Sequence, residues 1–174
     1  MDAVTPDRIR NVVLVGHGSA GKTTLAEALL FEAKAINRRG RVEDGNTVCD
    51  FDAEEQAHRL SLSLALAPFE WKGHKVNLID TPGYADFVGD VAAALRVVDL
   101  AVFVVSAVEG VEVQTEAIWK MAAALGVPRM IFINKLDRER ASFPRVLEQL
   151  RDRFGAGIAP LELPIGEETS FRGV

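Results

Sequence analysis

The chain has 174 residues, of which 48% are hydrophobic and 26% charged, a balance typical of a soluble globular domain and not of a disordered or membrane protein. Its net charge of −5 argues against DNA binding or any unaided grip on nucleic acid, and no run approaches the roughly 20 apolar residues of a membrane span. The single cysteine, Cys49, excludes an internal disulfide, so we expect one cytoplasmic domain over residues 1–174.

The first elements along the chain are predicted to be a strand, a loop and a helix. Residues 9–15 hold an apolar run that ends in glycines, and residues 23–35 carry leucines at helical spacing. Residues 37–59 are polar and charged without a clear period, which predicts a connector longer than an ordinary turn. We expect the acidic stretch within it, residues 50–55, to be solvated.

A hairpin is predicted next. The leucines at positions 60, 62, 64 and 66 alternate with small residues, which is the period of a half-buried strand over residues 60–67. Lys72-Gly73 is a turn signal, and a second strand over residues 75–79 runs into Asp80, after which proline and glycine end it. A helix over residues 88–98 should follow.

Two continuous apolar runs, residues 100–105 and 130–133, are each typical of a central parallel strand covered on both faces. Helices are expected between them, at residues 115–125, and after them, at residues 144–154, where Pro144 suits the first turn. The alternation of strands and helices predicts an α/β fold with a doubly wound, mostly parallel sheet and helices on both faces. The ligand site of such a sheet lies at the carboxyl ends of its strands.

Residues 16–23 fit the P-loop pattern G-x-x-x-x-G-K-[ST] between a predicted strand and helix. Backbone N–H groups of such a loop face a phosphate, Lys22 reaches the β and γ phosphates, and the Thr23 hydroxyl binds Mg²⁺, with Asp80 as a further metal candidate. The alternative is a glycine-rich turn with a surface lysine. The predicted phosphate-binding residues are Gly16, His17, Gly18, Ser19, Ala20, Gly21, Lys22, Thr23 and Thr24.

The motif Asn134-Lys135-Leu136-Asp137 at the end of an apolar strand selects the base. The Asp137 carboxylate can accept hydrogen bonds from N1–H and the exocyclic amine of guanine, whereas adenine offers neither donor there. Asn134 would hold the purine edge and the loop, and the aliphatic stem of Lys135 would cover one face of the base. In isolation these are four residues of a turn, and only the P-loop upstream makes the motif specific.

The P-loop, Asp80-Thr81-Pro82-Gly83 and the Asn-Lys-Leu-Asp motif together resemble the translational GTPases. Residues 110–115, 127–129, 137–138 and 163–166 are similar to the elongation factor G family at matching places, so the likeness covers nearly the whole chain. It implies a Ras-like P-loop NTPase fold that binds GTP or GDP with Mg²⁺, and the ribosome as partner.

The resemblance also implies roles for single residues. Gly83 would offer its backbone N–H to the γ-phosphate, and Ser61 would close over Mg²⁺ through its hydroxyl. The alternative for Ser61 is an ordinary small residue on the exposed face of a strand, since the period-two pattern explains it equally well. The implied catalytic residues are Lys22, Gly83 and Tyr84, and the implied metal ligands are Thr23, Ser61 and Asp80.

The chain departs from the family pattern in several places. Tyr84 replaces a histidine that helps to position the attacking water, Ser19 replaces an aspartate, and His58-Arg59 replaces Arg-Gly. A neutral tyrosine with a longer ring predicts slow intrinsic hydrolysis and favours a paralogous, elongation factor G-like group. The family's last guanine motif would lie beyond residue 174, so we expect a monomeric fragment that ends within an insertion.

The leading functional hypothesis is hydrolysis of GTP to GDP and phosphate, which drives a ribosome-linked cycle. A GTP-regulated module that binds the ribosome and hydrolyses little is the alternative, and Tyr84 favours it. An ATP-using P-loop protein is disfavoured by Asp137, whose carboxylate adenine would leave unpaired.

Overall fold

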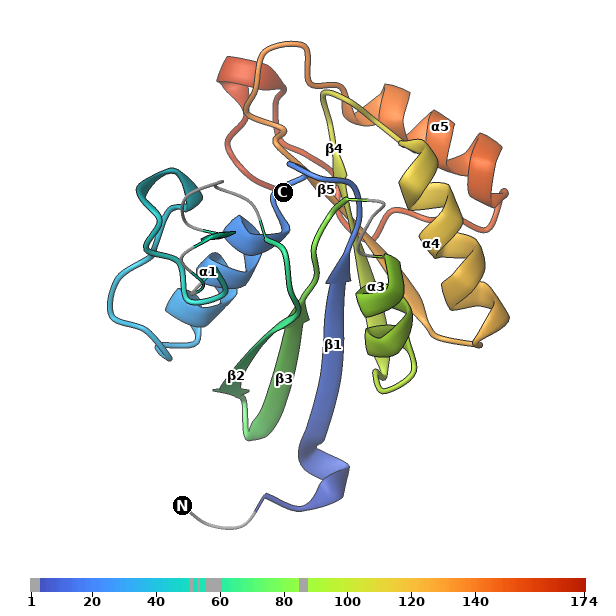
Figure 1. The fold of residues 1–174 in the computed structure, drawn as a ribbon. Helices are drawn as coiled ribbons and strands as arrows, with labels where there is room; N and C mark the ends of the chain where they lie inside the picture. Colours follow the sequence, from blue (N-terminus) through green and yellow to red (C-terminus); the bar gives the residue numbers. More distant parts are fainter. Residues whose placement is uncertain (1–3, 51, 53, 56–60, 85–87) are drawn as a thin grey trace.

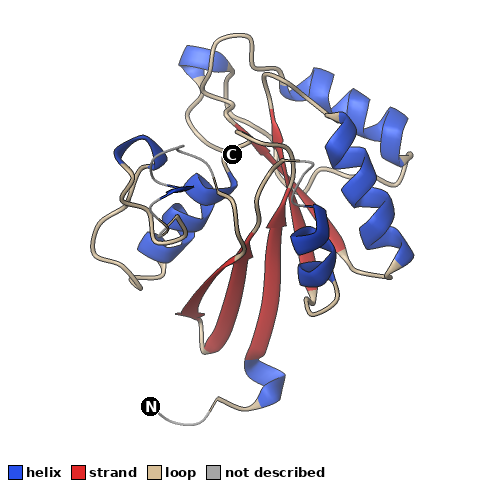
Figure 2. Ribbon diagram, in the orientation of Figure 1, coloured by secondary structure: helices blue, strands red, loops and turns tan. Residues whose placement is uncertain are grey.

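The computed structural model describes residues 4–50, 52, 54–55, 61–84 and 88–174, and its centre is a five-stranded sheet in the order β2-β3-β1-β4-β5 (Figures 1 and 2). Strand β1 (Ile9–Val15) lies between β3 (His74–Asp80) and β4 (Leu100–Ser106), and both pairings are parallel. Strand β5 (Arg129–Asn134) pairs parallel with β4, while β2 (Ala65–Trp71) pairs antiparallel with β3. The predicted mostly parallel α/β sheet is therefore confirmed.

Helices cover both faces of this sheet (Figure 1). Helix α1 (Lys22–Glu32) packs on one face through Ala26 and Leu30, which meet Leu14 and Leu78 of the sheet. The other face carries α3 (Val88–Leu95), α4 (Val113–Ala124) and α5 (Phe143–Phe154). Short 3-10 helices lie at Pro6–Arg8 (η1), Val42–Asp44 (η2) and Glu168–Ser170 (η4). Within the described residues, no helix is both long and apolar enough to span a membrane.

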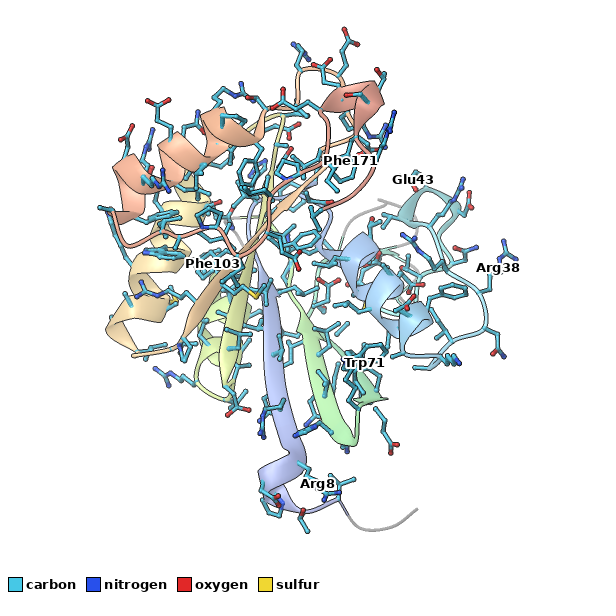
Figure 3. The ribbon with its side chains drawn as sticks, turned by 180° about the vertical axis from the view of Figure 1, so that it is seen from behind. Arg8, Arg38, Glu43, Trp71, Phe103 and Phe171 are labelled. Atoms are coloured by element: carbon cyan, nitrogen blue, oxygen red, sulfur yellow. The ribbon has the colours of Figure 1, made fainter. Side chains whose placement is uncertain are left out.

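The core beneath α3 and α4 is built around Phe103 of β4, which has no exposed surface (Figure 3). Its ring meets Trp119 edge to face at 4.9 Å between centroids, and Trp119 stacks on Phe154 of α5 at 4.3 Å. Aromatic pairs of this kind stabilise a core by about 0.5–1.5 kcal/mol beyond their burial. These ring contacts hold α4 and α5 against the face of β4.

The first strand of the hairpin differs from the prediction in its bounds and in its buried face. It begins at Ala65 and runs to Trp71, and its buried side chains are Ala65 and Ala67, while Leu66 is 63% exposed. The register with β3 explains this, because Ala65 pairs with Asp80 and the small side chains lie where α1 approaches closely. The turn at Lys72-Gly73 is confirmed, with positive φ at both residues. Leu60 lies outside the described residues.

The prediction that β5 is covered on both faces is wrong. Ile131 and Ile133 pack under α5, but Met130 is 42% and Phe132 38% exposed on the opposite face. The reason is position, because β5 is an edge strand and α1, which covers the same face, lies over β1 to β3. The apolar run at residues 130–133 therefore corresponds to a strand that is buried only on the face that packs against α5.

Two acidic residues of the connector are buried, which corrects the expectation of solvation for Asp50 and Glu55, while Asp52 and Glu54 are exposed as expected. Asp50 and Glu55 are 3% and 2% exposed, and Cys49 packs with the core beneath α1. Burial is tolerated because both carboxylates accept hydrogen bonds, Asp50 from Thr47 in the connector and Glu55 from the backbone N–H groups of residues 62 and 63 just after it.

Candidate nucleotide-binding site

The phosphate loop joins the end of β1 to the start of α1, at the carboxyl edge of the sheet. Gly16 has φ of 141°, and a Cβ there would overlap the carbonyl of Val104 in β4. Gly21 has φ of 97°, and a Cβ there would overlap the side-chain amide of Asn134. Both positions therefore need glycine for conformation and for space. The loop takes the tight course that the motif predicts.

Lys22 is the buried cation of this loop. Its Nζ donates to the carbonyl oxygens of Gly16 at 3.1 Å and His17 at 3.0 Å, so the ammonium lies across the loop. Burial lowers the pKa of Lys22 to about 8, and the nearby Asp80 carboxylate opposes this shift. Desolvation disfavours the charged form, which a bound phosphate would stabilise. The geometry excludes the alternative of a surface lysine on a plain turn.

Thr23 of α1 and Asp80 of β3 meet beside the phosphate loop. The Thr23 hydroxyl donates to Asp80 Oδ2 at 2.6 Å, while Asp80 Oδ1 is buried and has no hydrogen-bond partner among the described residues. Burial raises the pKa of Asp80 to about 6, against the hydrogen bond from Thr23 and the charge of Lys22. An unpartnered buried carboxylate oxygen beside a hydroxyl is the donor set that Mg²⁺ prefers.

Ser61, in the segment between the connector and β2, lies beside this pair. Its Oγ lies 3.2 Å from Thr23 Oγ1 and donates to Asp50 Oδ1 at 2.7 Å. Ser61 precedes β2 and is not on the exposed face of that strand, so the structure excludes the alternative drawn from the sequence pattern. The three predicted metal ligands therefore stand together.

Three carboxylates that hold the connector were missed by the sequence analysis. Glu27 Oε1 accepts from the backbone N–H of Val48 at 2.6 Å, and its Oε2 accepts from that of Gly40 at 2.7 Å. Asp50 also accepts from Thr47. Glu55 accepts from the backbone N–H groups of residues 62 and 63 at 2.9 and 3.0 Å. A usable signal existed for Glu27, since it shares the buried face of α1 with Thr23 and Leu30.

The segment after β3 lies directly on the phosphate loop. The Thr81 hydroxyl donates to the Leu14 carbonyl at 2.7 Å, which anchors the turn. A Cβ at Gly83 would stand 2.5 Å from Lys22 Nζ and 2.6 Å from Gly18 N. Tyr84 follows with 41% of its surface exposed and its ring against Gly18. Gly83 and Tyr84 are thus both at the loop, as the resemblance implies.

The Asn134-Lys135-Leu136-Asp137 motif, which is predicted to bind the base, begins where β5 ends. Asn134 Nδ2 donates to the Ala20 carbonyl of the phosphate loop at 2.9 Å, which joins the two parts of the site. Lys135 has φ of 62°, and its Nζ lies 3.9 Å from Glu109 Oε2. Asp137 is exposed at the same rim of the sheet. The predicted base and phosphate residues therefore share one edge.

The segment after α5 returns to support this motif. The Glu168 carboxylate accepts from the backbone N–H of Arg140 at 2.7 Å, and the Glu168 N–H donates to the Leu136 carbonyl at 3.1 Å. Phe171 packs against the buried Leu136 and Ala141 (Figure 3). Glu168 and Phe171, about 30 residues further along the chain, therefore support the loop that carries Asp137.

Some predicted residues make no side-chain contact within the site in the described part of the chain. Ser19 and Thr24 are exposed, at the outer edge of the loop and on the first turn of α1, and Ser19 has φ of 61°. His58 and Arg59, which replace the family's Arg-Gly, lie outside the described residues.

Comparisons with known proteins agree with this geometry. The family described as elongation factor Tu GTP binding domain matches residues 7–171. An elongation factor G-like protein of Mycobacterium tuberculosis is 49% identical over 162 residues, which cover 93% of this chain and 23% of the relative. An elongation factor G of Dehalococcoides mccartyi is 41% identical over 167 residues, which cover 96% of this chain and 24% of that protein.

A crystal structure of a Thermus thermophilus protein has a TM-score of 0.89 to this chain at 46% identity and covers 94% of this chain and 24% of that one. The chain thus spans about a quarter of the length of the relatives that it matches. The resemblance expected from the motifs is confirmed. The chain belongs to the elongation factor Tu GTP-binding domain family, within the elongation factor G group of translational GTPases.

Proposed function

We propose that the chain binds GTP and GDP with Mg²⁺ and hydrolyses GTP as part of a translation factor. The observation that carries this proposal is the hydrogen bond from Asn134 to the Ala20 carbonyl, because it sets a guanine-reading motif beside a phosphate loop. A purine nucleotide bound at this edge of the sheet would place its phosphates in the loop and its base at the Asn134–Asp137 motif.

The phosphate end would work by charge and position. Loop N–H groups and the start of α1 provide a fixed positive potential, and Lys22 can exchange its two carbonyl acceptors for phosphate oxygens. The carbonyl oxygens are neutral acceptors, whereas phosphate oxygens carry negative charge, so the exchange adds Coulomb attraction to the hydrogen bonds of the ammonium. The transferring phosphoryl group would be stabilised in the same way, without a covalent intermediate.

The metal end would be formed by the hydroxyls of Thr23 and Ser61, with Asp80 Oδ1 holding a coordinated water or the ion. When bound, Mg²⁺ neutralises charge on the β and γ phosphates. Thr23 keeps its hydroxyl aimed by donating to Asp80, and Ser61 keeps its own by donating to Asp50.

The base end would select guanine through Asp137. Its exposed carboxylate has room to accept from N1–H and the exocyclic amine of guanine. ATP would leave this carboxylate unpaired and lose binding by several orders of magnitude, as sites built for a substrate's own donors do.

Hydrolysis itself is proposed to be slow, and Tyr84 is the reason. The neutral phenol cannot take a proton from water as imidazole can, and its longer ring fills space at the loop. Replacing Tyr84 with histidine should raise GTP turnover on ribosomes. Turnover equal to or below that of the wild type would show that Tyr84 is not the limiting feature.

The ribosome is proposed as partner because relatives at 41% and 49% identity are an elongation factor G and a G-like protein. A second function, a GTP-regulated module that occupies the ribosome in the cytoplasm and hydrolyses little, is favoured by the same Tyr84. Single-turnover GTP hydrolysis by the full-length protein, with and without ribosomes, separates the two. Strong stimulation supports the enzyme, and ribosome binding without stimulation supports the module.

A further inference from the structure

The hydroxyl oxygens of Thr23 and Ser61 stand 3.2 Å apart, and the proton of each is directed elsewhere. Thr23 donates to Asp80 Oδ2 at 2.6 Å, and Ser61 donates to an oxygen of Asp50 at 2.7 Å. A hydroxyl has a single proton, so when the two carboxylates are ionised only lone pairs of the two oxygens face one another. Neighbouring ligands of an octahedral Mg²⁺ ion stand roughly 2.9 Å apart, which is close to this separation. The two carboxylates therefore aim the two hydroxyls as metal ligands.

The two carboxylates are held in different ways. Asp80 ends β3, and its backbone is fixed by the pairing with Leu14 of β1. Asp50 lies in the connector and belongs to no helix or strand, so no ladder of backbone hydrogen bonds fixes its orientation. The aim of the Ser61 hydroxyl therefore depends on the side chains that hold Asp50.

Thr47 holds both the backbone and the carboxylate of Asp50. Its hydroxyl accepts from the Asp50 N–H at 3.3 Å and donates to Asp50 Oδ2 at 3.0 Å. Thr47 and Asp50 are only 6% and 3% exposed, so little water competes for these bonds. One oxygen of the carboxylate thus accepts from Thr47 while the other accepts from Ser61, and together the two bonds fix its plane.

The position of Thr47 is in turn set by α1. The N–H of the next residue, Val48, donates to Glu27 Oε1 at 2.6 Å, and Cys49 packs in the core beneath α1. These contacts hold residues 47–50 against the helix whose first turn carries Thr23. Thr47 and the metal ligands therefore share one support.

We propose that Thr47 is a positioning residue for Mg²⁺, because it acts through Asp50 to keep the lone pairs of the Ser61 hydroxyl directed at the ion. This inference rests on the proposed binding of a guanine nucleotide with Mg²⁺. Thr47 itself touches neither the metal nor the nucleotide. Without its hydroxyl, the Asp50 carboxylate can rotate and the Ser61 proton can turn toward Thr23, where it opposes a cation. The loss should therefore appear only when Mg²⁺ is present.

The test measures how much Mg²⁺ tightens the binding of a non-hydrolysable GTP analogue to the full-length protein. Calorimetry gives the dissociation constant in EDTA and in saturating Mg²⁺, and the ratio of the two is the gain from the metal. Thr47→Val keeps the shape of the side chain and removes the hydroxyl, so this ratio should fall about 3- to 10-fold, the size of one hydrogen bond. The dissociation constant in EDTA should equal that of the wild type.

Thr47→Ser is the matched control, because it keeps the hydroxyl, and its ratio should equal that of the wild type. Thr47→Ala removes the hydroxyl without a second methyl group, so it should repeat the result of Thr47→Val and replaces that variant if valine impairs folding. In a Ser61→Ala background, Thr47→Val should lower the ratio no further, since both changes act on one ligand.

Two results would overturn the inference while the proposed function stands. One is a wild-type ratio in the variants that lack the Thr47 hydroxyl. The other is an equal loss of affinity with and without Mg²⁺, which would make Thr47 a purely structural residue of the connector. A wild type that does not bind the analogue, or binds it no more tightly with Mg²⁺, overturns the proposed function and this inference together.

Discussion

The two halves of the candidate site are built in different ways. The phosphate half consists of residues 16–23 with residues 61 and 80–84, and its key side chains, Lys22, Thr23 and Asp80, are all buried. The base half consists of residues 134–140 with Glu168, and its Asp137 is exposed. The first half is part of the junction between sheet and helix, whereas the second is a loop held by hydrogen bonds to Ala20 and Glu168 and by the packing of Phe171. Binding strength and folding should therefore depend on the first half, and selectivity on the second.

Lys22→Ala should have the largest effect. The variant removes the one ammonium that spans the loop, so GDP affinity should fall at least about 100-fold, the cost of two charge-assisted bonds. Equilibrium binding of a fluorescent GDP analogue measures this loss. Lys120→Ala on the exposed side of α4 is the control and should bind as the wild type does. Similar GDP affinities for Lys22→Ala and Lys120→Ala would show that binding strength does not depend on the phosphate half.

Glu27→Ala tests whether the connector beside the phosphate half, which Glu27 anchors to α1, supports folding. The variant leaves the half-buried hydrogen bonds from the N–H groups of Gly40 and Val48 without their charged acceptor, so the free energy of unfolding should fall by about 2–4 kcal/mol. Urea denaturation measures this change.

Glu32→Ala, at the exposed end of the same helix, is the matched control for Glu27→Ala and should cost less than about 0.5 kcal/mol. Equal costs for the two variants would mean that the connector is not anchored through Glu27.

Glu168→Ala tests the base half of the site and should have the smallest effect of the three variants. It removes the acceptor of the Arg140 N–H and loosens the loop that carries Asp137, so GDP affinity should fall about 2- to 5-fold, as for one exposed hydrogen bond. The free energy of unfolding should change little. Glu162→Ala, on the same segment, is the control and should leave GDP affinity and the free energy of unfolding unchanged. A loss of stability in Glu168→Ala as large as in Glu27→Ala would contradict the view that the base half contributes little to folding.

The sequence predicted the phosphate half well because its signals are local. The glycines, Lys22 and Thr23 stand in one short motif between a strand and a helix, and β1 and β4 follow apolar runs. For Ser61 the sequence left two alternatives open, a metal ligand or a small residue on the exposed face of a strand, because the period-two pattern fitted the second as well as the resemblance fitted the first.

Long-range contacts could not be predicted in the same way. The burial of Glu27 depends on backbone N–H groups from Gly40 and Val48, and nothing in the residues near Glu27 indicates them. The exposure of Phe132 depends on where β5 stands in the sheet, which its apolar run does not encode. The contact of Tyr84 with Gly18 joins two motifs that the sequence shows only separately.

Nucleotide competition tests the central claim most directly. Labelled GDP bound to the full-length protein should be displaced by GTP but not by about a 1,000-fold excess of ATP, since only guanine pairs with Asp137. In Asp137→Asn this selectivity should collapse, and xanthine nucleotides should now compete, because the amide can donate to the xanthine C2 oxygen. Displacement of GDP by ATP and GTP at equal concentrations would contradict the account.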